Sequence, residues 1–190
     1  MLNVSLIRHF ALSIILPTSM LAVLSGADAK DYSFFKLQFP GAEQTIPYGI
    51  NNRGEIVGTY NDSTGQHGFV LERGVFTSID VPFSGVTETV AEGINDRGQI
   101  VGWYNDIFST GPHGFVLSFR ENKKGRRAVF TSFDVSFPEA TATFGFGINR
   151  RGEIIGIYND STGEHGFVAT PSEDDDSEND RDHHHHKHFE

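Results

Sequence analysis

The chain has 190 residues, enough for one domain with a sizeable core and flanking segments. Its 21 glycines and 17 phenylalanines favour short strands joined by tight turns, and the absence of cysteine leaves the compartment open, because exported proteins need not carry disulfides. The formal charge is −10 and no basic surface stands out, which argues against nucleic acid as a partner.

Residues 1–29 have the pattern of a secretory signal peptide. A charged start precedes an apolar run over residues 10–24, and an Ala-x-Ala exit ends at Ala29. The alternative is an uncleaved membrane anchor, but Pro17 interrupts the run, which is shorter than the roughly 20 apolar residues that a span needs. We therefore expect cleavage after Ala29, export to the periplasm or the cell exterior, and a mature chain without a membrane partner.

The next element in the chain, Tyr32–Phe39, predicts a strand that ends at a Pro-Gly turn. Two later segments, Val75–Phe83 and Val129–Phe137, resemble it and alternate apolar with polar side chains, which is the period of a half-buried strand. Each of the three segments is followed by a turn-rich stretch and then by a tract that begins with Gly-Ile-Asn.

This tract occurs three times, 44 and then 54 residues apart. The copies are Gly49–Val70, Gly93–Val116 and Gly147–Val168. In the first copy Asn51–Gly54 has the composition of a hairpin turn, with Asn where the turn begins and Gly where a left-handed residue is needed. The segments on either side of a second turn, Glu55–Tyr60 and His67–Leu71, are then predicted strands.

Each copy therefore contributes four strands in about 44 residues, the size of a propeller blade. The last copy lacks its fourth strand, and we expect Tyr32–Phe39 to supply it, so that residues 30–170 form an all-β domain of three four-stranded, propeller-like repeats. Two alternatives remain: a β-trefoil-like three-fold barrel, and an open arc whose sheet edges pair with another copy as a homo-oligomer.

The second copy is longer than the others in two places. Extra residues fall in Asp106–His113 and in Ser118–Ala128, and insertions of this kind are typical of surface loops. The second insertion carries five basic residues: Arg120, Lys123, Lys124, Arg126 and Arg127. It is either a solvated hairpin tip or a contact point for an acidic partner.

The tail, residues 171–190, is acidic and then rich in histidine, and it has too few apolar side chains to offset the entropy of ordering. We predict that it is disordered. Its histidines could chelate zinc, copper or nickel, although such a stretch binds metals loosely without a dedicated role and a cloning remnant is an alternative. The candidate metal ligands are His183, His184, His185, His186 and His188.

The tract resembles the HAF-type extracellular repeat, which is named for a His-x-Phe motif and occurs in exported bacterial proteins. The residues that carry the resemblance in the first copy are Gly-Ile-Asn, Gly54, Gly58, Tyr60, Asp62 and His67-Gly68-Phe69, with the strand that follows. Here Gly stands where the family name has Ala. The resemblance covers about residues 32–170 and implies an all-β extracellular repeat protein of unassigned biochemical role, with no catalytic residue.

Two sets of repeated polar residues admit a functional and a structural interpretation. His67, His113 and His165 would bind a metal if they converged on an axis; alternatively each ring bonds within its own repeat, to the neighbouring aspartate. Those aspartates and the turn asparagines are better explained as turn formers than as calcium ligands, because each loop has too few carboxylates. The aspartates are Asp62, Asp106 and Asp160, and the asparagines are Asn51, Asn95 and Asn149.

Repeated aromatic residues predict core packing, with one exception. Trp103 stands where the other copies have Thr59 and Ile157, and this singularity makes it a candidate ligand contact. No catalytic triad, cysteine nucleophile, phosphate loop or metalloprotease motif is present, so we expect no enzyme activity and no cofactor. The sequence favours an exported binding module for glycan or protein, and the alternative is a metal-handling protein acting through the histidine-rich tail.

Overall fold

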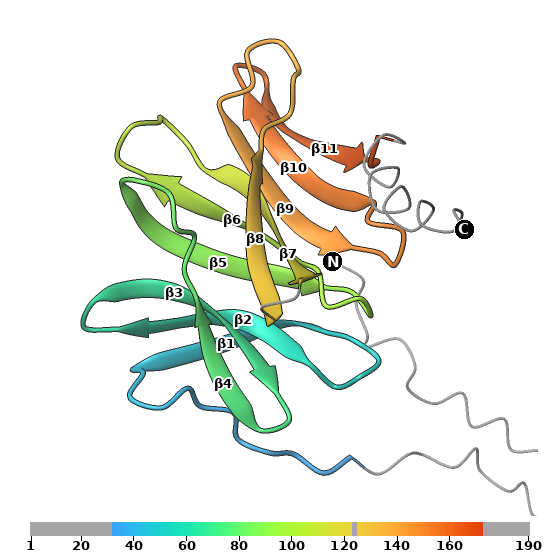
Figure 1. Cartoon of the computed structure of the whole chain (residues 1–190). Coiled ribbons are helices and arrows are strands. Elements are labelled where there is room, and N and C mark those ends of the chain that lie inside the picture. Colours follow the sequence, from blue (N-terminus) through green and yellow to red (C-terminus); the bar gives the residue numbers. More distant parts are fainter. Residues whose placement is uncertain (1–31, 123–124, 173–190) are drawn as a thin grey trace, which may run out of the picture. The chain divides into compact units, whose positions relative to one another are not determined.

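Figure 1 shows the computed structural model, which describes residues 32–122 and 125–172. The chain divides into two units, residues 1–36 and residues 37–190, and the fold belongs to the second. The predicted signal segment and the histidine-rich tail lie outside the described residues. Within the described part, no helix is long and apolar enough to cross a membrane.

The described part of the chain is all-β, with eleven strands in an eight-stranded mixed sheet and a three-stranded antiparallel sheet. Within each repeat, consecutive strands pair as an antiparallel meander, so the three sequence copies correspond to three structural repeats. The first repeat contains β1 (Gln44–Ile50), β2 (Ile56–Asp62), β3 (Gly65–Glu72) and β4 (Val75–Ile79). The second contains β5 (Val86–Ile94), β6 (Ile100–Asp106), β7 (His113–Asn122) and β8 (Gly125–Phe133). The third contains β9 (Ala142–Ile148), β10 (Ile154–Asp160) and β11 (Gly163–Ala169).

Each repeat meets the one before it through its first strand. β5 contacts β3, β2 and β1 and pairs in parallel with β3 at Gln66–Glu88, and β9 contacts β6, β5 and β7, which places the second repeat between the first and the third (Figure 1). Glycines allow this approach: a Cβ atom at Gly49 would lie 2.7 Å from the Glu92 carbonyl oxygen, and one at Gly93 would lie 2.7 Å from that of Phe146. Any larger side chain at either glycine would push the repeats apart.

The turn between the first two strands of each repeat is the predicted Asn–Gly hairpin. Oδ1 of Asn51 accepts hydrogen bonds from the backbone N–H groups of Arg53 and Glu55, both at 3.0 Å, and Gly54 has φ = 76°. The other repeats contain the same turn, built on Asn95 and Asn149. The interpretation of these asparagines as turn formers is confirmed.

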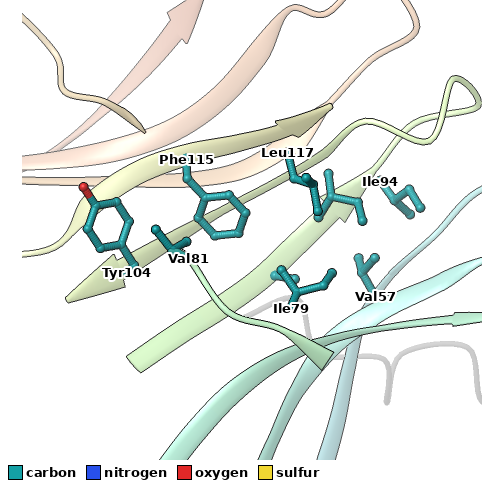
Figure 2. Close-up of a cluster of buried hydrophobic side chains, with 9 residues drawn as sticks. Val57, Ile79, Val81, Ile94, Tyr104, Phe115 and Leu117 are labelled. Carbon is teal, nitrogen blue, oxygen red and sulfur yellow. The ribbon is translucent and has the colours of Figure 1, made fainter. Parts of the chain in front are cut away.

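Two clusters of buried side chains form the core. Figure 2 shows the larger one, in which Val57, Ile79 and Val81 from the first repeat and its exit pack against Ile94, Tyr104, Phe115 and Leu117 from the second. The smaller cluster joins the second and third repeats through Val101, Ile154 and Phe167. Because both clusters span a junction between repeats, hydrophobic burial holds the stack of repeats together.

The predicted closure by the N-terminal strand is wrong. Residues 32–39 contain no strand, the third repeat has three strands, and the described strands form neither a closed barrel nor a closed ring, which also removes the trefoil-like alternative. The physical reason is position: Tyr32–Phe39 has the sequence of a fourth strand but precedes the first repeat, and its Phe39 packs on Tyr60 of that repeat, with ring centroids 3.7 Å apart.

The fourth strands of the first two repeats end earlier than predicted, at Ile79 and Phe133. Beyond these points the backbone changes partner, because the N–H of Val81 donates to Oγ1 of Thr89 at 3.2 Å, and Val135 donates to Thr143 in the same way. The chain therefore leaves one repeat by bonding to the first strand of the next.

The insertion at Ser118–Ala128 extends the β7–β8 hairpin, in agreement with its interpretation as part of a hairpin. Pairing continues through Phe119–Ala128, Arg120–Arg127 and Glu121–Arg126. The tip of this hairpin, residues 123–124, lies outside the described residues.

Candidate functional site

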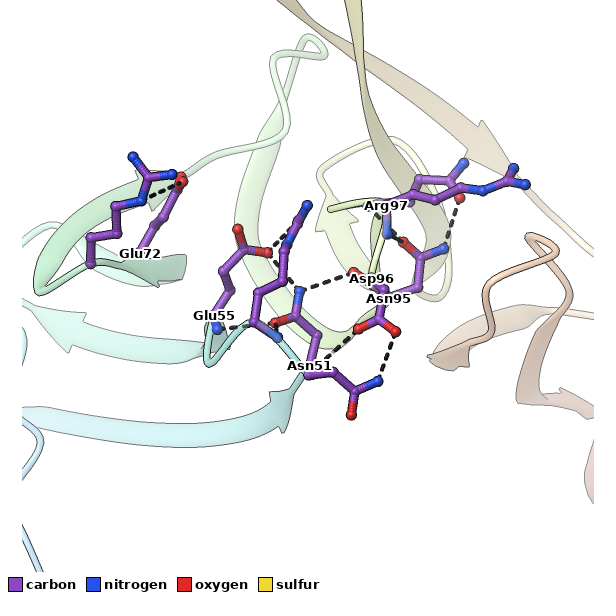
Figure 3. Close-up of polar contacts among 10 residues, drawn as sticks. Asn51, Glu55, Glu72, Asn95, Asp96 and Arg97 are labelled. Carbon is purple, nitrogen blue, oxygen red and sulfur yellow. Dashed lines mark hydrogen bonds and ion pairs between the residues drawn. The ribbon is translucent and has the colours of Figure 1, made fainter.

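The turns of the first two repeats lie next to each other. The side-chain amide of Asn51 donates to the Asn95 carbonyl at 3.0 Å, and Asn52 donates its own backbone N–H and its side-chain amide to the Asp96 carboxylate (Figure 3). The hydrogen bonds from Asn52, aided by the charges of Arg150 and Arg53, lower the pKa of Asp96 below its ordinary value. This network joins the two turns that carry Arg53 and Arg97.

An open, polar hollow of about 460 Å³ lies beside these turns. It receives side chains from the two turns, from the β3–β4 connection and from the extended β7–β8 hairpin. Its lining residues are Arg53, Glu55, Glu72, Arg73, Arg97, Phe119, Glu121 and Arg126. Four arginines and three glutamates give this surface a small positive charge in a chain whose formal charge is −10.

Three of the arginines gather around the turn at Gly98. A Cβ atom at Gly98 would lie 3.0 Å from Nη2 of Arg53 and 3.6 Å from Nη2 of Arg126, and Arg97 is the preceding residue. The guanidinium of Arg126 stacks on the Phe119 ring, 3.8 Å from its centroid. Such stacking holds a guanidinium in place while leaving its N–H donors available.

The charges of these arginines are compensated unequally. Nη2 of Arg53 lies 2.6 Å from Oε2 of Glu55, and Arg151 makes the same pair with Glu153 in the third repeat. In the second repeat the equivalent acid is replaced by Gln99, which accepts the same hydrogen bond from the turn asparagine but carries no charge. Among the described residues, neither Arg97 nor Arg126 has an ion-pair partner within 4.0 Å.

The repeated histidines each bond within their own repeat. Nδ1 of His67 lies 2.6 Å from Oδ1 of Asp80, and Nδ1 of His113 lies 2.9 Å from Oδ2 of Asp134. His165 contacts Asp160 through Nε2 at 3.1 Å. Within residues 32–122 and 125–172, no group of three or more His, Asp and Glu side chains is placed to hold a metal ion.

The aspartates before each second hairpin are turn formers, as predicted. Oδ1 of Asp62 accepts hydrogen bonds from the N–H and hydroxyl of Thr64, and Asp160 accepts the equivalent pair from Thr162. In the longer loop of the second repeat, Asp106 accepts from the backbone N–H groups of Phe108 and Ser109. These bonds lower the pKa of all three carboxyl groups.

Trp103 lies at the junction of the second and third repeats. Its half-buried ring meets Phe144 edge-on, with centroids 5.4 Å apart, and its Nε1 donates to Oε1 of Glu92 at 3.2 Å. Burial raises the pKa of Glu92, although the bond from Trp103 opposes the shift. Trp103 is not among the residues that line the hollow, and its contact with a ligand stays a prediction. The interpretation of the other aromatics as core is confirmed for Tyr60, Tyr104, Phe69, Phe115 and Phe167.

The arginine cluster was missed by the sequence analysis, although the sequence contains a signal for it. Arg occupies the third position of the turn in every copy, as Arg53, Arg97 and Arg151, while its acidic neighbour becomes Gln99 in the second copy alone. No sequence pattern predicts that Arg126 and Phe119 belong to this cluster, because only the folded β7–β8 hairpin brings them close to the turn. The predicted metal ligands His183, His184, His185, His186 and His188 lie outside the described residues.

Comparison of the chain with protein-family models, with curated proteins and with solved structures gives no match.

Proposed function

We propose that this protein is an exported, non-catalytic binding module that takes an acidic glycan in the hollow beside Arg97. The observation that carries the proposal is the uncompensated charge of Arg97. The turn arginines of the first and third repeats each have a glutamate at 2.6 Å, whereas Gln99 leaves the middle one without that partner. An arginine positioned by a buried turn and free of an acid is suited to receive an anion from solution.

The chemistry of the hollow favours carboxylate or sulfate groups on a sugar. The planar guanidinium offers paired N–H donors that match such anions, and the cluster around Gly98 supplies three of them. The volume of about 460 Å³ lies within the range of about 300–1,000 Å³ that is usual for ligand sites. Glu55, Glu72 and Glu121 supply acceptors for sugar hydroxyls at the same surface.

We further infer that the three repeats are propeller-like blades arranged in an arc. Support comes from the antiparallel meanders, from the contact of their first strands, and from the resemblance to the HAF-type repeat. Export is supported by the signal-like pattern of residues 1–29 and by the same resemblance. An acidic glycan outside the cytoplasm is a ligand that a protein in this compartment would meet.

Calorimetric titration with a sulfated tetrasaccharide tests this function, with an uncharged tetrasaccharide of the same length for comparison. We expect binding of the sulfated sugar alone, and affinity that falls as salt is raised. The Arg97→Gln variant should bind about tenfold more weakly, because one charge-assisted contact is lost. Arg151→Gln is the matched control: it removes the equivalent turn arginine outside the hollow and should leave the affinity unchanged. Equal affinity for both sugars, or equal losses in both variants, would refute the proposal.

A further inference from the structure

The last strand of the fold lacks a neighbour that its counterparts have. β3 pairs with β2 and β4, and β7 pairs with β6 and β8. Among the described residues β11 pairs with β10 alone, and its Val168 is 69% exposed. A sheet edge of this kind presents unpaired N–H and C=O groups that can accept another strand.

Residues 32–36 have the sequence of the missing strand. Aligning Phe39 with Phe83 places Phe35 at the position of Ile79, an inward residue of β4. The structure supports the alignment, because Phe39 packs on Tyr60 as Phe83 packs on Tyr104 of the next repeat. Phe137 and Tyr158 repeat the contact at the third repeat. Phe35 is nevertheless 89% exposed, and no strand forms at residues 32–36.

The third repeat also has a packing surface that no other repeat covers among the described residues. The backbone at Gly49 packs on β5 and that at Gly93 packs on β9, whereas a Cβ atom at Gly147 would meet only the side chain of Ile155 within 4 Å. Ile155 is 56% exposed, although its equivalents Val57 and Val101 are fully buried. The third repeat thus presents the surface on which a further repeat would pack.

The hydrogen bonds between repeats also leave the third repeat without a following neighbour. The side-chain amide of Asn51 donates to the Asn95 carbonyl, and that of Asn95 donates to the Asn149 carbonyl at 2.8 Å. The amide of Asn149 donates to Glu153 of its own turn and, among the described residues, to no further repeat. The first repeat is complementary, since within the described part of the chain its Asn51 carbonyl accepts from Gly54 of its own turn and from no other repeat.

The first repeat of the same chain is poorly placed to fill this site. Phe39 is fixed on the first repeat, and the five residues before it reach at most about 18 Å. The first and third repeats lie on opposite sides of the second (Figure 1), and two sheet-to-sheet steps amount to about 20 Å before the outer edge of β11 is reached. The complementary surface must come from another molecule.

We propose that two copies of this chain assemble head to tail, so that residues 32–36 of each copy add a fourth strand to β11 of the other. The registers of β3–β4 and β7–β8 place Phe35 of one copy opposite Gly166 of the other and Ser33 opposite Val168. The position is open: a Cβ atom at Gly166 would meet only the Gly156 carbonyl, at 3.9 Å. At the equivalent Gly114 the space is filled by the Phe133 ring.

The pair would combine six repeats, which lies within the range of about 4–8 blades found in closed propellers.

Two side chains of residues 32–36 differ from their equivalents in the first repeat. Phe34 and Lys36 stand where the first repeat has Ser78 in β4 and Asp80 just after it, so the hydroxyl bond to the repeat's tyrosine and the carboxylate bond to its histidine are not reproduced. Backbone pairing and burial of Phe35 therefore stabilise the junction.

Cysteine cross-linking tests this assembly, because the chain has no cysteine of its own. A Ser33→Cys variant is mixed with a Val168→Cys variant and oxidised. We expect a disulfide-linked product that contains one copy of each, because directly opposed residues in paired strands lie at the separation a disulfide needs. Lys36→Cys mixed with Val168→Cys is the out-of-register control and should give at least tenfold less product. Equal yields from the two mixtures would contradict the proposed register.

Three further measurements complete the test. Native mass spectrometry of the mature chain should give two copies; a single copy or an open-ended series would overturn the proposal. A chain that carries both Ser33→Cys and Val168→Cys should cross-link between copies, and a closed single copy would instead show that the segment folds back on its own third repeat. Gly166→Val should leave the circular dichroism spectrum unchanged and reduce the mass to one copy; retention of two copies would contradict the packing of Phe35 there.

Discussion

The side-chain amide of Asn95 donates to the carbonyl of Asn149, 54 residues further along the chain and 2.8 Å away. The same side chain accepts hydrogen bonds from the backbone of Arg97 and Gln99 and is only 4% exposed. One residue thus closes its own turn and attaches the next repeat. Because the position is buried, the groups it satisfies have no access to water as a substitute.

Asn95→Ala should therefore be strongly destabilising. We expect the free energy of unfolding to fall by about 2–4 kcal/mol, since several buried donors and acceptors lose their partner together. Urea denaturation measures the change. Asn52→Ala is the control: its side chain also joins two repeats, the first and the second, through Asp96, but it is exposed, and its loss should cost less than about 1 kcal/mol. Equal losses in the two variants would show that Asn95 does not hold the repeats together.

Gly102→Ala tests the close approach of strand and aromatic ring in the second repeat. A Cβ atom there would lie 1.9 Å from the Val90 carbonyl oxygen and 2.8 Å from the Phe115 ring, both in the core. We expect a loss of about 3 kcal/mol or more, because neither neighbour can move without displacing others. Gly166→Ala, at an open position, should change the unfolding free energy of a single copy by less than about 0.5 kcal/mol. A well-tolerated Gly102→Ala would mean that β6 and its neighbours are less closely packed than described.

Acid should destabilise the fold through the turn aspartates. Hydrogen bonds from Thr64 lower the pKa of Asp62, the N–H of Phe108 contributes most to the lowered pKa of Asp106, and Thr162 acts on Asp160 as Thr64 does on Asp62. A carboxyl group whose pKa is lower in the folded state adds stability above its unfolded pKa of about 3.9, and this contribution is lost as the pH falls through the folded value.

A triple variant with Asp62→Asn, Asp106→Asn and Asp160→Asn measures this contribution. Asparagine still accepts the turn hydrogen bonds, so we expect the variant to be less stable than the parent at pH 7, with a difference that shrinks as the pH falls toward 2. Chemical denaturation across this pH range gives both values. Glu164→Gln removes an exposed carboxylate outside these turns and serves as the control. A stability difference that persists undiminished at pH 2 would contradict the linkage.

The sequence predicted the repeating unit well because its requirements are local. The turns built on Asn51, Asn95 and Asn149 need a side-chain acceptor and a glycine with positive φ, and both appear as residue identities in each copy. The predicted bond between a histidine and the aspartate of its own second turn forms only between His165 and Asp160, because His67 and His113 bond to Asp80 and Asp134, which follow the fourth strands. For the asparagine turns, residue type and spacing are nearly the whole cause.

The ends of the stack could not be predicted in the same way. Tyr32–Phe39 has the composition of a fourth strand, but a strand exists only where a neighbouring strand offers its edge, and composition cannot show which molecule supplies it. An insertion indicates a surface feature but does not show how far the flanking strands extend, and here cross-strand pairing of Phe119 with Ala128 continues the hairpin into the inserted residues. The hollow needs two repeats in contact, which no single copy of the tract contains.

The most direct test of the central claim is the affinity of Gln99→Glu for a sulfated tetrasaccharide. This change removes no arginine and restores to the second repeat the acid that Glu55 and Glu153 provide in the others. If the uncompensated charge of Arg97 makes the hollow a site for anions, the variant should bind about tenfold more weakly than the parent at low salt while unfolding at the same urea concentration. Unchanged affinity would contradict the account, because the hollow would then bind without depending on that charge.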